Sequence, residues 1–148
     1  MESTRYKIGE VSRKLDVAVE TIRMYEREGL IVVAKTETGQ RYYDDEDLKW
    51  LNCIRRLIKE QGLNIEGIRR LLSLMPCWKI RPCTIAQRES CPAFNGAIKP
   101  CWMLKDSTQC HCQDIDCRDC AIYRKAHECT NLKEILQQYL QIEQHPVD

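Results

Sequence analysis

The chain has 148 residues, of which 43% are apolar, and a formal net charge of +1. This length allows one compact domain or two small ones, and the apolar fraction is sufficient for a hydrophobic core. No apolar run approaches the ~20 residues that a membrane-spanning helix needs, and the start of the chain lacks the apolar segment of a signal peptide. We therefore expect a cytoplasmic protein without membrane contact, in which any basic face for nucleic acid arises from local placement of charge.

The first two predicted elements are short helices joined by a tight turn. Residues 8–15 are predicted to form a helix with Gly9 as its N-cap and Glu10 in the first turn, where a carboxylate suits the helix dipole. A turn at residues 16–18 leads into the second helix. Five apolar residues are spaced so that the helices share one seam: Val11, Leu15, Val17, Ile22 and Tyr25. This spacing fits a helix-turn-helix, and equally a helical hairpin without a ligand.

The segment after the second helix favours the helix-turn-helix. Gly29 can take the left-handed conformation that ends a helix, and residues 30–33 are then predicted to form a strand. Residues 36–39 are expected to turn, and residues 40–43 to return as a second strand. A β-hairpin in this place is a wing, so we expect the second helix to enter a DNA groove.

Two further helices follow. Asp44 is expected to cap the first of them, with Asp47 at the capping-box position, and the helix should end at Gly62. Cys53 lies beside its apolar stripe and is expected to be a small packed residue. Asn64 should cap the next helix. The two apolar faces consist of Leu48, Leu51, Ile54, Leu57 and Ile58, and of Ile65, Ile68, Leu71, Leu72 and Met75.

Five short motifs occur in order along this half of the chain: Ile8-Gly9-Glu10-Val11, Thr21-Ile22-Arg23-Met24-Tyr25-Glu26, Gly29-Leu30-Ile31, Gly39-Gln40-Arg41-Tyr42-Tyr43 and Gly62-Leu63-Asn64-Ile65-Glu66-Gly67-Ile68. Together they resemble the winged helix-turn-helix domain of the MerR family of transcription regulators. The resemblance implies a homodimer that binds double-stranded promoter DNA and distorts it so that RNA polymerase can or cannot engage. Two departures are Ala18, where a Ser or Thr cap worth on the order of 1 kcal/mol is usual, and Tyr42, where a second arginine often stands.

The same resemblance implies which residues contact DNA. Positions that match Arg23 and Tyr25 on the second helix, and Arg41 and Tyr43 on the wing, contact the DNA backbone, for which a guanidinium and a phenol are suitable donors. Base reading would fall to the start of the second helix, in the major groove. The full expected set is Arg13, Lys14, Val19, Glu20, Thr21, Arg23, Tyr25, Arg27, Arg41 and Tyr43.

The composition changes abruptly at Pro76. In most MerR regulators a long helix would continue here into a coiled coil with a second subunit, but four prolines prevent it: Pro76, Pro82, Pro92 and Pro100. Pro76-Cys77-Trp78 recurs as Pro100-Cys101-Trp102, and the region resembles a small module with two Cys-Trp dipeptides found on bacterial signalling proteins, whose ligand is left open. We therefore divide the chain into a DNA-binding domain, a cysteine-rich module and a C-terminal helix, at residues 1–75, 76–130 and 131–148.

Nine of the ten cysteines fall in this module, which in a reducing cytosol indicates metal, cluster or redox chemistry. Residues 110–120 contain four thiols, enough for one tetrahedral Zn²⁺ or an iron–sulfur cluster. Zinc ribbons usually contain two C-x-x-C pairs, and only Cys117 and Cys120 are so spaced, which favours iron–sulfur. The candidate metal ligands are Cys77, Cys83, Cys91, Cys101, Cys110, Cys112, Cys117, Cys120 and Cys129.

The predicted fold is mainly α: a winged helix-turn-helix domain, a loop-rich module stabilised by metal or cluster, and a C-terminal helix. Asn131 and Glu134 approximate a capping box for that helix, which either mediates dimerisation or folds back on its own domain. No phosphate loop, metalloprotease motif or nucleophile elbow is present, so no enzyme is expected. The predicted function is a MerR-type regulator whose module senses redox state or metal through an iron–sulfur cluster. The alternative is a structural zinc module for protein–protein interaction.

Overall fold

The computed structural model describes residues 4–81, 83–96, 99–104, 116–129 and 132–140. Its fold is mainly helical, with one small two-stranded sheet. Within the described ranges, no helix is both long enough and apolar enough to span a membrane.

Helices α1 (Ile8–Leu15) and α2 (Val19–Arg27) open the chain. Their predicted seam is confirmed, since Val11, Ile22 and Tyr25 are all buried. The N-cap of α1 is Lys7 rather than Gly9, because the Glu10 carboxylate accepts a hydrogen bond from the Lys7 backbone N–H at 2.9 Å. Helix α2 begins after Ala18 without a side-chain cap, as expected.

The β-hairpin is shorter and lies later in the chain than the sequence predicted. Strand β1 (Ala34–Lys35) pairs antiparallel with β2 (Arg41–Tyr42). Residues 30–33 are not a strand, so that prediction was wrong. Their backbone carbonyls instead accept hydrogen bonds from distant side chains: Leu30 from Trp50 and Val32 from Arg118.

Helices α3 (Asp45–Lys59) and α4 (Ile65–Ser73) begin as predicted. The Asp44 carboxylate accepts from the Asp47 backbone N–H at 2.9 Å, and the Asp47 carboxylate accepts from the Asp44 N–H at 3.0 Å. Asn64 caps α4 by accepting from the Gly67 N–H at 2.7 Å. Cys53 is 1% exposed, as expected of a packed residue.

Short elements make up the cysteine-rich part: α5 (Cys77–Ile80), α6 (Ile85–Ser90), α7 (Ala121–Ala126) and the 3₁₀ turns η1 (Cys101–Met103) and η2 (Cys117–Asp119). The chain then forms α8 (Leu132–Leu140), which contacts α5 and buries Ile135. The described residues of the last helix therefore pack on their own chain, and dimerisation through this helix stays a prediction. The expected cap Asn131 lies outside the described residues.

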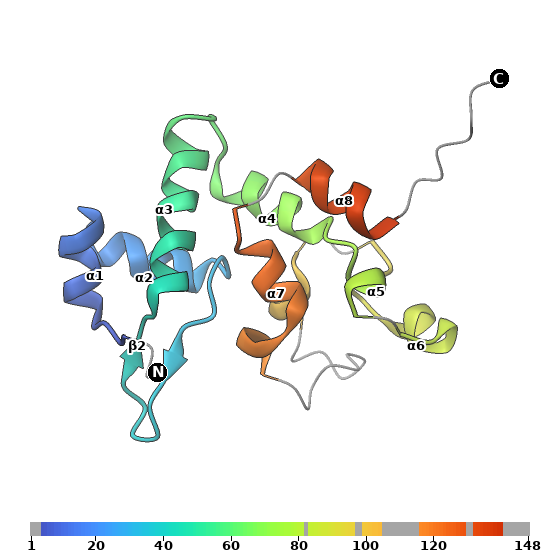
Figure 1. Cartoon of the computed structure of the whole chain (residues 1–148), viewed down its shortest axis with the longest axis horizontal. Helices are drawn as coiled ribbons and strands as arrows, with labels where there is room; N and C mark the ends of the chain where they lie inside the picture. The colour runs from blue at the N-terminus through green and yellow to red at the C-terminus, as the bar shows by residue number, and fades with distance from the viewer. Residues whose placement is uncertain (1–3, 82, 97–98, 105–115, 130–131, 141–148) are drawn as a thin grey trace.

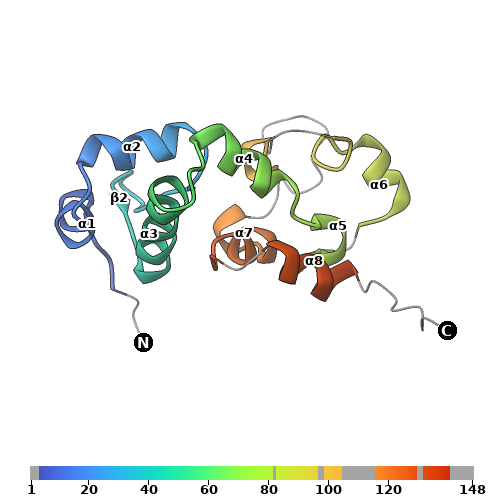
Figure 2. The same cartoon turned by 90° about the horizontal axis from the view of Figure 1, so that it is seen from above.

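One hydrophobic core joins the two halves of the chain. Trp102, Ile122 and Tyr123 belong to the same buried cluster as Val11 and Ile22 of the first two helices. The described elements extend from α1 at one end to α6 at the other, and in both views α7 lies between α3 and α5 (Figures 1 and 2). The predicted boundary at Pro76 is thus crossed by packing contacts, and the cysteine-rich part is docked on the first domain.

Candidate nucleic-acid interface and the docked module

A cleft of about 650 Å³ lies between the wing and the first two helices. Four of its seven lining residues are cations, contributed by the start of α1, the exposed face of α2 and the wing: the lining consists of Lys7, Ile8, Arg23, Arg27, Gly39, Gln40 and Arg41. Separate elements thus bring positive charge together in a chain whose net charge is only +1. A nearly neutral chain needs a local basic surface to bind nucleic acid, and this cleft provides one.

Two of the three arginines that line this cleft form ion pairs. The Arg41 Nε donates to both carboxylate oxygens of Glu26, at 3.0 and 3.1 Å, which ties the wing to α2. The Arg23 Nη1 donates to Glu20 at 2.8 Å on the surface of α2. The two arginine side chains are 49% and 54% exposed. Exposed pairs contribute only ~0–1 kcal/mol, so a DNA phosphate can compete for either guanidinium.

The other expected DNA contacts divide into surface and core residues. Arg13, Lys14, Glu20 and Arg27 are exposed, and Val19 and Thr21 are partly exposed on the first turn of α2. All of these residues are accessible to a ligand. The cleft is also lined by Lys7 and Gln40, which the expected set omitted. Gln40 lies inside one of the five motifs, and this could have indicated it as a site residue. Lys7 precedes the first motif, so no motif indicated it.

The two tyrosines of the expected set lie inside the domain. Tyr25 is 4% exposed and Tyr43 is fully buried, so neither ring lies on the surface of the cleft. The Tyr43 hydroxyl has no hydrogen-bond partner among the described residues. Burial, with the nearby Glu26 carboxylate, raises the pKa of Tyr43 to about 12. The structure therefore places both rings beneath α2 and the wing rather than beside a phosphate.

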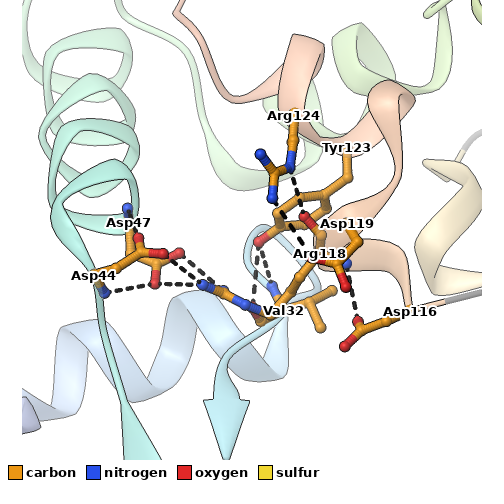
Figure 3. A network of polar contacts seen from close by, with 8 residues as sticks. All are labelled: Val32, Asp44, Asp47, Asp116, Arg118, Asp119, Tyr123 and Arg124. Carbon is orange, nitrogen blue, oxygen red and sulfur yellow. Dashed lines mark hydrogen bonds and ion pairs between the residues drawn. The ribbon is translucent and has the colours of Figure 1, made fainter. Parts of the chain in front are cut away.

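Arg118 is the main polar link between the cysteine-rich part and the DNA-binding domain (Figure 3). It reaches across from η2 to the first turn of α3, where its two Nη atoms donate to both carboxylate oxygens of Asp47, at 2.9 and 2.8 Å. Its Nη2 also lies 3.3 Å from the Asp44 carboxylate. Burial alone would lower the pKa of the Arg118 guanidinium, but the hydrogen bonds and charge of Asp47 raise it. The guanidinium therefore stays charged in this contact.

The segment that follows α2 is held by aromatic side chains. Trp102 Nε1 donates to the Gly29 carbonyl at 2.7 Å, and Trp50 Nε1 donates to the Leu30 carbonyl at 2.8 Å. The Tyr123 hydroxyl accepts from the Val32 N–H at 2.9 Å. Two of these three side chains, Trp102 and Tyr123, belong to the cysteine-rich part. The position of this part is therefore coupled directly to the end of α2 and the start of the wing.

Two observations favour glycine at position 29. Its φ is +78°, in the left-handed region that favours glycine. A Cβ added there would also overlap the side chain of Met103, which packs against the glycine from η1. The absence of a side chain thus allows η1 to approach the end of α2.

Six of the nine expected metal ligands are partly buried in the described residues: Cys77, Cys83, Cys91, Cys101, Cys117 and Cys120. Burial raises the pKa of Cys77 to about 11, with added contributions from Cys91 and Cys83. Among the described residues, no three His, Cys, Asp or Glu side chains are grouped so that they could hold a metal ion. Cys110 and Cys112 lie outside the described residues, so the expected four-thiol loop is described only at Cys117 and Cys120.

Cys129 requires a correction to the expected ligand set. It forms a disulfide with Cys53, across 76 positions of sequence. A sulfur in a disulfide has no thiolate to offer a metal, so Cys129 is not a metal ligand in this structure. Cys53 is packed as predicted, but its partner could not be inferred, because the two cysteines lie on opposite sides of the composition change.

Comparisons with known proteins agree with this geometry. The family model described as "MerR HTH family regulatory protein" matches residues 6–74. The HTH-type transcriptional regulator ZntR of Escherichia coli K12 is 39% identical over 95 residues, which are 64% of this chain and 61% of that protein. The heavy metal-dependent transcription regulator 2 of Rhizobium meliloti is 40% identical over 75 residues, 50% of this chain and 48% of that protein.

The mercuric resistance operon regulatory protein of Bacillus cereus is also similar, with 39% identity over 72 residues, 48% of this chain and 54% of that protein. The chain thus spans between about half and three fifths of the length of these relatives. No solved structure gives a significant match. The matched range coincides with α1 to α4, the wing and the cation-lined cleft, and residues 6–74 are therefore similar to the helix-turn-helix domain of MerR regulatory proteins.

Proposed function

We propose that the chain is a MerR-type transcription regulator that binds double-stranded promoter DNA as a homodimer and controls the engagement of RNA polymerase. The observation that carries the proposal is the cleft in which Lys7, Arg23, Arg27 and Arg41 meet, on a domain of this regulator family. The three relatives described above are named as regulators, not as enzymes. The proposal accordingly assigns no catalytic role to the chain.

In this proposal the charged residues position the domain and the start of α2 reads the bases. Arg13, Lys14, Arg23, Arg27 and Arg41 contact phosphates, which fixes register without reading sequence. Val19, Glu20 and Thr21 face the major groove from the first turn of α2. Tyr25 and Tyr43 support the helix and the wing from the core, so their contribution to DNA binding is indirect.

The cysteine-rich part is proposed as the sensor of metal or redox state. Two of the relatives are named for metals, one as heavy metal-dependent and one as a mercuric resistance regulator. Cys91 and Cys83 both raise the pKa of the Cys77 thiol, Cys117 begins η2 and Cys120 follows it directly. These thiols, together with those of Cys101, Cys110 and Cys112, are proposed to bind an iron–sulfur cluster. The alternative is Zn²⁺ with a structural role, in which case the module binds a protein partner.

The sensor is coupled to the DNA-binding domain through Arg118, Trp102 and Tyr123. These side chains hold the start of α3 and the segment after α2. A change of ligand at the cysteines that shifts η2 or η1 would therefore shift the relative placement of α2 and the wing. Such a shift is the kind of two-state change that a regulator needs.

Two measurements test this function. DNA fragments selected from a random pool by the full chain should share one sequence with two-fold symmetry, as expected of a dimer. Iron, zinc and sulfide contents, with a visible spectrum, should be measured on protein purified without air. Iron with sulfide and visible absorbance supports the cluster, whereas zinc alone supports the structural alternative. Failure to enrich any sequence would reject the regulator.

A further inference from the structure

Cys53 and Cys129 join the two halves of the chain covalently. Cys53 lies in the middle of α3, and Cys129 lies just beyond the end of α7. Their Cα atoms are 6.0 Å apart and their sulfurs are bonded. This bond runs between the same two parts that the Arg118 ion pair and the aromatic side chains hold noncovalently.

The two cysteines differ sharply in their exposure to solvent. Cys53 is 1% exposed, whereas Cys129 is an exposed residue. Both line a cleft of about 540 Å³ between α3, α4 and α8, which gives a small reagent a route to the pair. A reagent that enters this cleft would therefore meet Cys129 first.

A guanidinium stands beside the accessible sulfur. Arg56, one turn along α3 from Cys53, places its Nη2 3.4 Å from the Cys129 Sγ. A neighbouring cation favours the thiolate, which is the form of cysteine that attacks a disulfide and also the form that leaves when a disulfide is reduced. Arg56 thus promotes both closing and opening at Cys129.

The backbone of Cys129 is held in an unfavourable conformation. Its φ is +58°, and among the described residues the only other residue besides glycine with a positive φ is Asp16. A residue with a Cβ pays for this left-handed conformation. Opening the disulfide would free Cys129 to leave it, which would loosen the end of α7.

The disulfide also closes one end of an aromatic stack. Trp50, one turn before Cys53 on α3, stacks on the His127 ring with centroids 4.3 Å apart and planes at 19°. The His127 and Tyr123 rings form a T-shaped contact with their centroids 3.8 Å apart. The cross-link therefore fixes the register of α7 against α3 at the place where Tyr123 reaches the segment after α2.

We propose that Cys53 and Cys129 form a reversible thiol–disulfide latch, which a low-molecular-weight disulfide closes and a low-molecular-weight thiol opens. The Cys129 thiolate attacks one sulfur of the small disulfide, forming a mixed disulfide and releasing one thiolate. Cys53 then loses its proton, attacks the Cys129 Sγ and expels the second thiolate. Two protein thiols are oxidised by two electrons, and one small disulfide is reduced to two thiols. Closing the latch fastens the cysteine-rich part to the DNA-binding domain; any effect on promoter DNA rests on the proposed function.

The full chain provides the test. Reduced protein is equilibrated with mixtures of reduced and oxidised glutathione, the pairing is mapped by mass spectrometry of peptides, and amide hydrogen exchange is followed over residues 117–128. We expect the fraction of cross-linked Cys53–Cys129 peptide to rise in one two-electron step as the mixture becomes more oxidising. Amide hydrogen exchange in this segment should slow by tenfold or more, and exchange in α1 should stay unchanged. The latch is overturned if the cross-link does not form, if Cys129 pairs with another cysteine instead, or if exchange does not change.

Single substitutions test the order of the two steps. Cys53→Ser should accumulate the mixed disulfide on Cys129, whereas Cys129→Ser should leave Cys53 unmodified because it is buried. Arg56→Gln should slow closure several-fold, and Lys59→Gln, which removes an exposed cation one turn further along α3, should not. Equal slowing by the two substitutions, or rapid modification of Cys53 in the Cys129→Ser protein, would contradict the mechanism.

DNA binding measured on the same oxidised and reduced samples separates the two proposals. A closed latch that alters affinity or promoter response supports both the latch and the proposed function. Absence of DNA binding in both states would reject the regulator while the mapped cross-link and the exchange data still support the latch. If the protein binds DNA but the cross-link does not form with oxidised glutathione, the latch alone is rejected.

Discussion

Arg118 and Asp47 form a bidentate ion pair, and the same Asp47 carboxylate is part of the capping box of α3. Both Asp47 oxygens accept from the Arg118 guanidinium, at 2.9 and 2.8 Å. The same Asp47 side chain completes the capping box that begins α3. The Arg118 side chain is 15% exposed and the Asp47 side chain is 5% exposed. The start of a helix in the DNA-binding domain is therefore also the anchor of the cysteine-rich part.

Replacing Arg118 with Ala should lower the free energy of unfolding by about 3 kcal/mol, because it leaves the buried Asp47 carboxylate without its cation. Arg124→Ala is the matched control, since Arg124 lies on α7, is 67% exposed and pairs with Asp119 at 3.5 Å. That change should cost less than about 1 kcal/mol. Chemical denaturation of both variants measures the difference, and equal losses would mean that Arg118 is not the anchor.

Replacing Arg41 with Ala should weaken binding to all DNA sequences alike and reduce the slope of log affinity against log salt by about 1, because one phosphate contact is lost. Lys49→Ala removes a cation from α3 that does not line the cleft and should leave the slope unchanged. Fluorescence anisotropy over a range of salt concentrations measures both slopes. An Arg41→Ala slope equal to that of the unmodified chain would remove Arg41 from the interface.

Tyr43→Phe should leave DNA affinity unchanged, because the hydroxyl is buried away from the cleft surface. Its raised pKa, about 12 against 10.0, also predicts a pH effect on stability. Between these values the unfolded chain releases the phenol proton and the folded chain retains it, so the unfolding free energy falls as the pH rises.

This residue should therefore account for a loss of about 1.3 kcal/mol between pH 9 and pH 11. The loss should be absent in Tyr43→Phe, and denaturation of the two proteins at both pH values isolates it. A large fall in DNA affinity of Tyr43→Phe would instead support the phosphate contact that the family resemblance implies.

Gly29→Ala should both strain the backbone and displace Met103 of η1. Gly62→Ala is a close control, since Gly62 has a φ of +71° but no atom within 4 Å of an added Cβ. The control should cost about 1 kcal/mol from the left-handed backbone alone, and Gly29→Ala should cost more. Hydrogen exchange should also rise around residues 101–104 only in Gly29→Ala. Equal costs with unchanged exchange would show that η1 does not depend on this glycine.

Reduction of the Cys53–Cys129 disulfide should lower the free energy of unfolding by about 4 kcal/mol, because the bond closes a loop of 76 positions. Denaturation with and without a thiol reductant measures this change. The Cys53→Ser protein, which cannot form the bond, serves as the control and should not respond to the reductant. A similar response in that variant would place the effect at other cysteines.

Local patterns in the sequence were sufficient to predict most of the first domain. The seam of α1 and α2, the Asp44–Asp47 capping box and the Asn64 cap all depend on residues a few positions apart, which periodicity and capping rules describe. The strand predicted at residues 30–33 was wrong for the opposite reason. Two of its backbone carbonyls accept hydrogen bonds from the side chains of Trp50 and Arg118, which are distant in sequence. The apolar run therefore packs without pairing with another strand.

The docking of the cysteine-rich part could not be predicted from local patterns. In the sequence, Arg118 is marked only by its place after Cys117, and no neighbouring residue indicates that it pairs with Asp47. Cys129 was grouped with the other clustered cysteines, although its sulfur meets Cys53. Tyr43 was assigned to DNA because its wing position matched the family, whereas in the structure it follows β2, forms a bridge with Tyr6 and is buried in the core.

The most direct test of the proposed regulator is the affinity of the full chain for the DNA fragment that it selects, compared with unrelated DNA of the same length at physiological salt. We predict that the selected fragment binds on the order of 10³-fold or more tightly, and that this preference is lost when Val19, Glu20 and Thr21 are replaced together by Ala. Equal affinity for the two DNAs would contradict it.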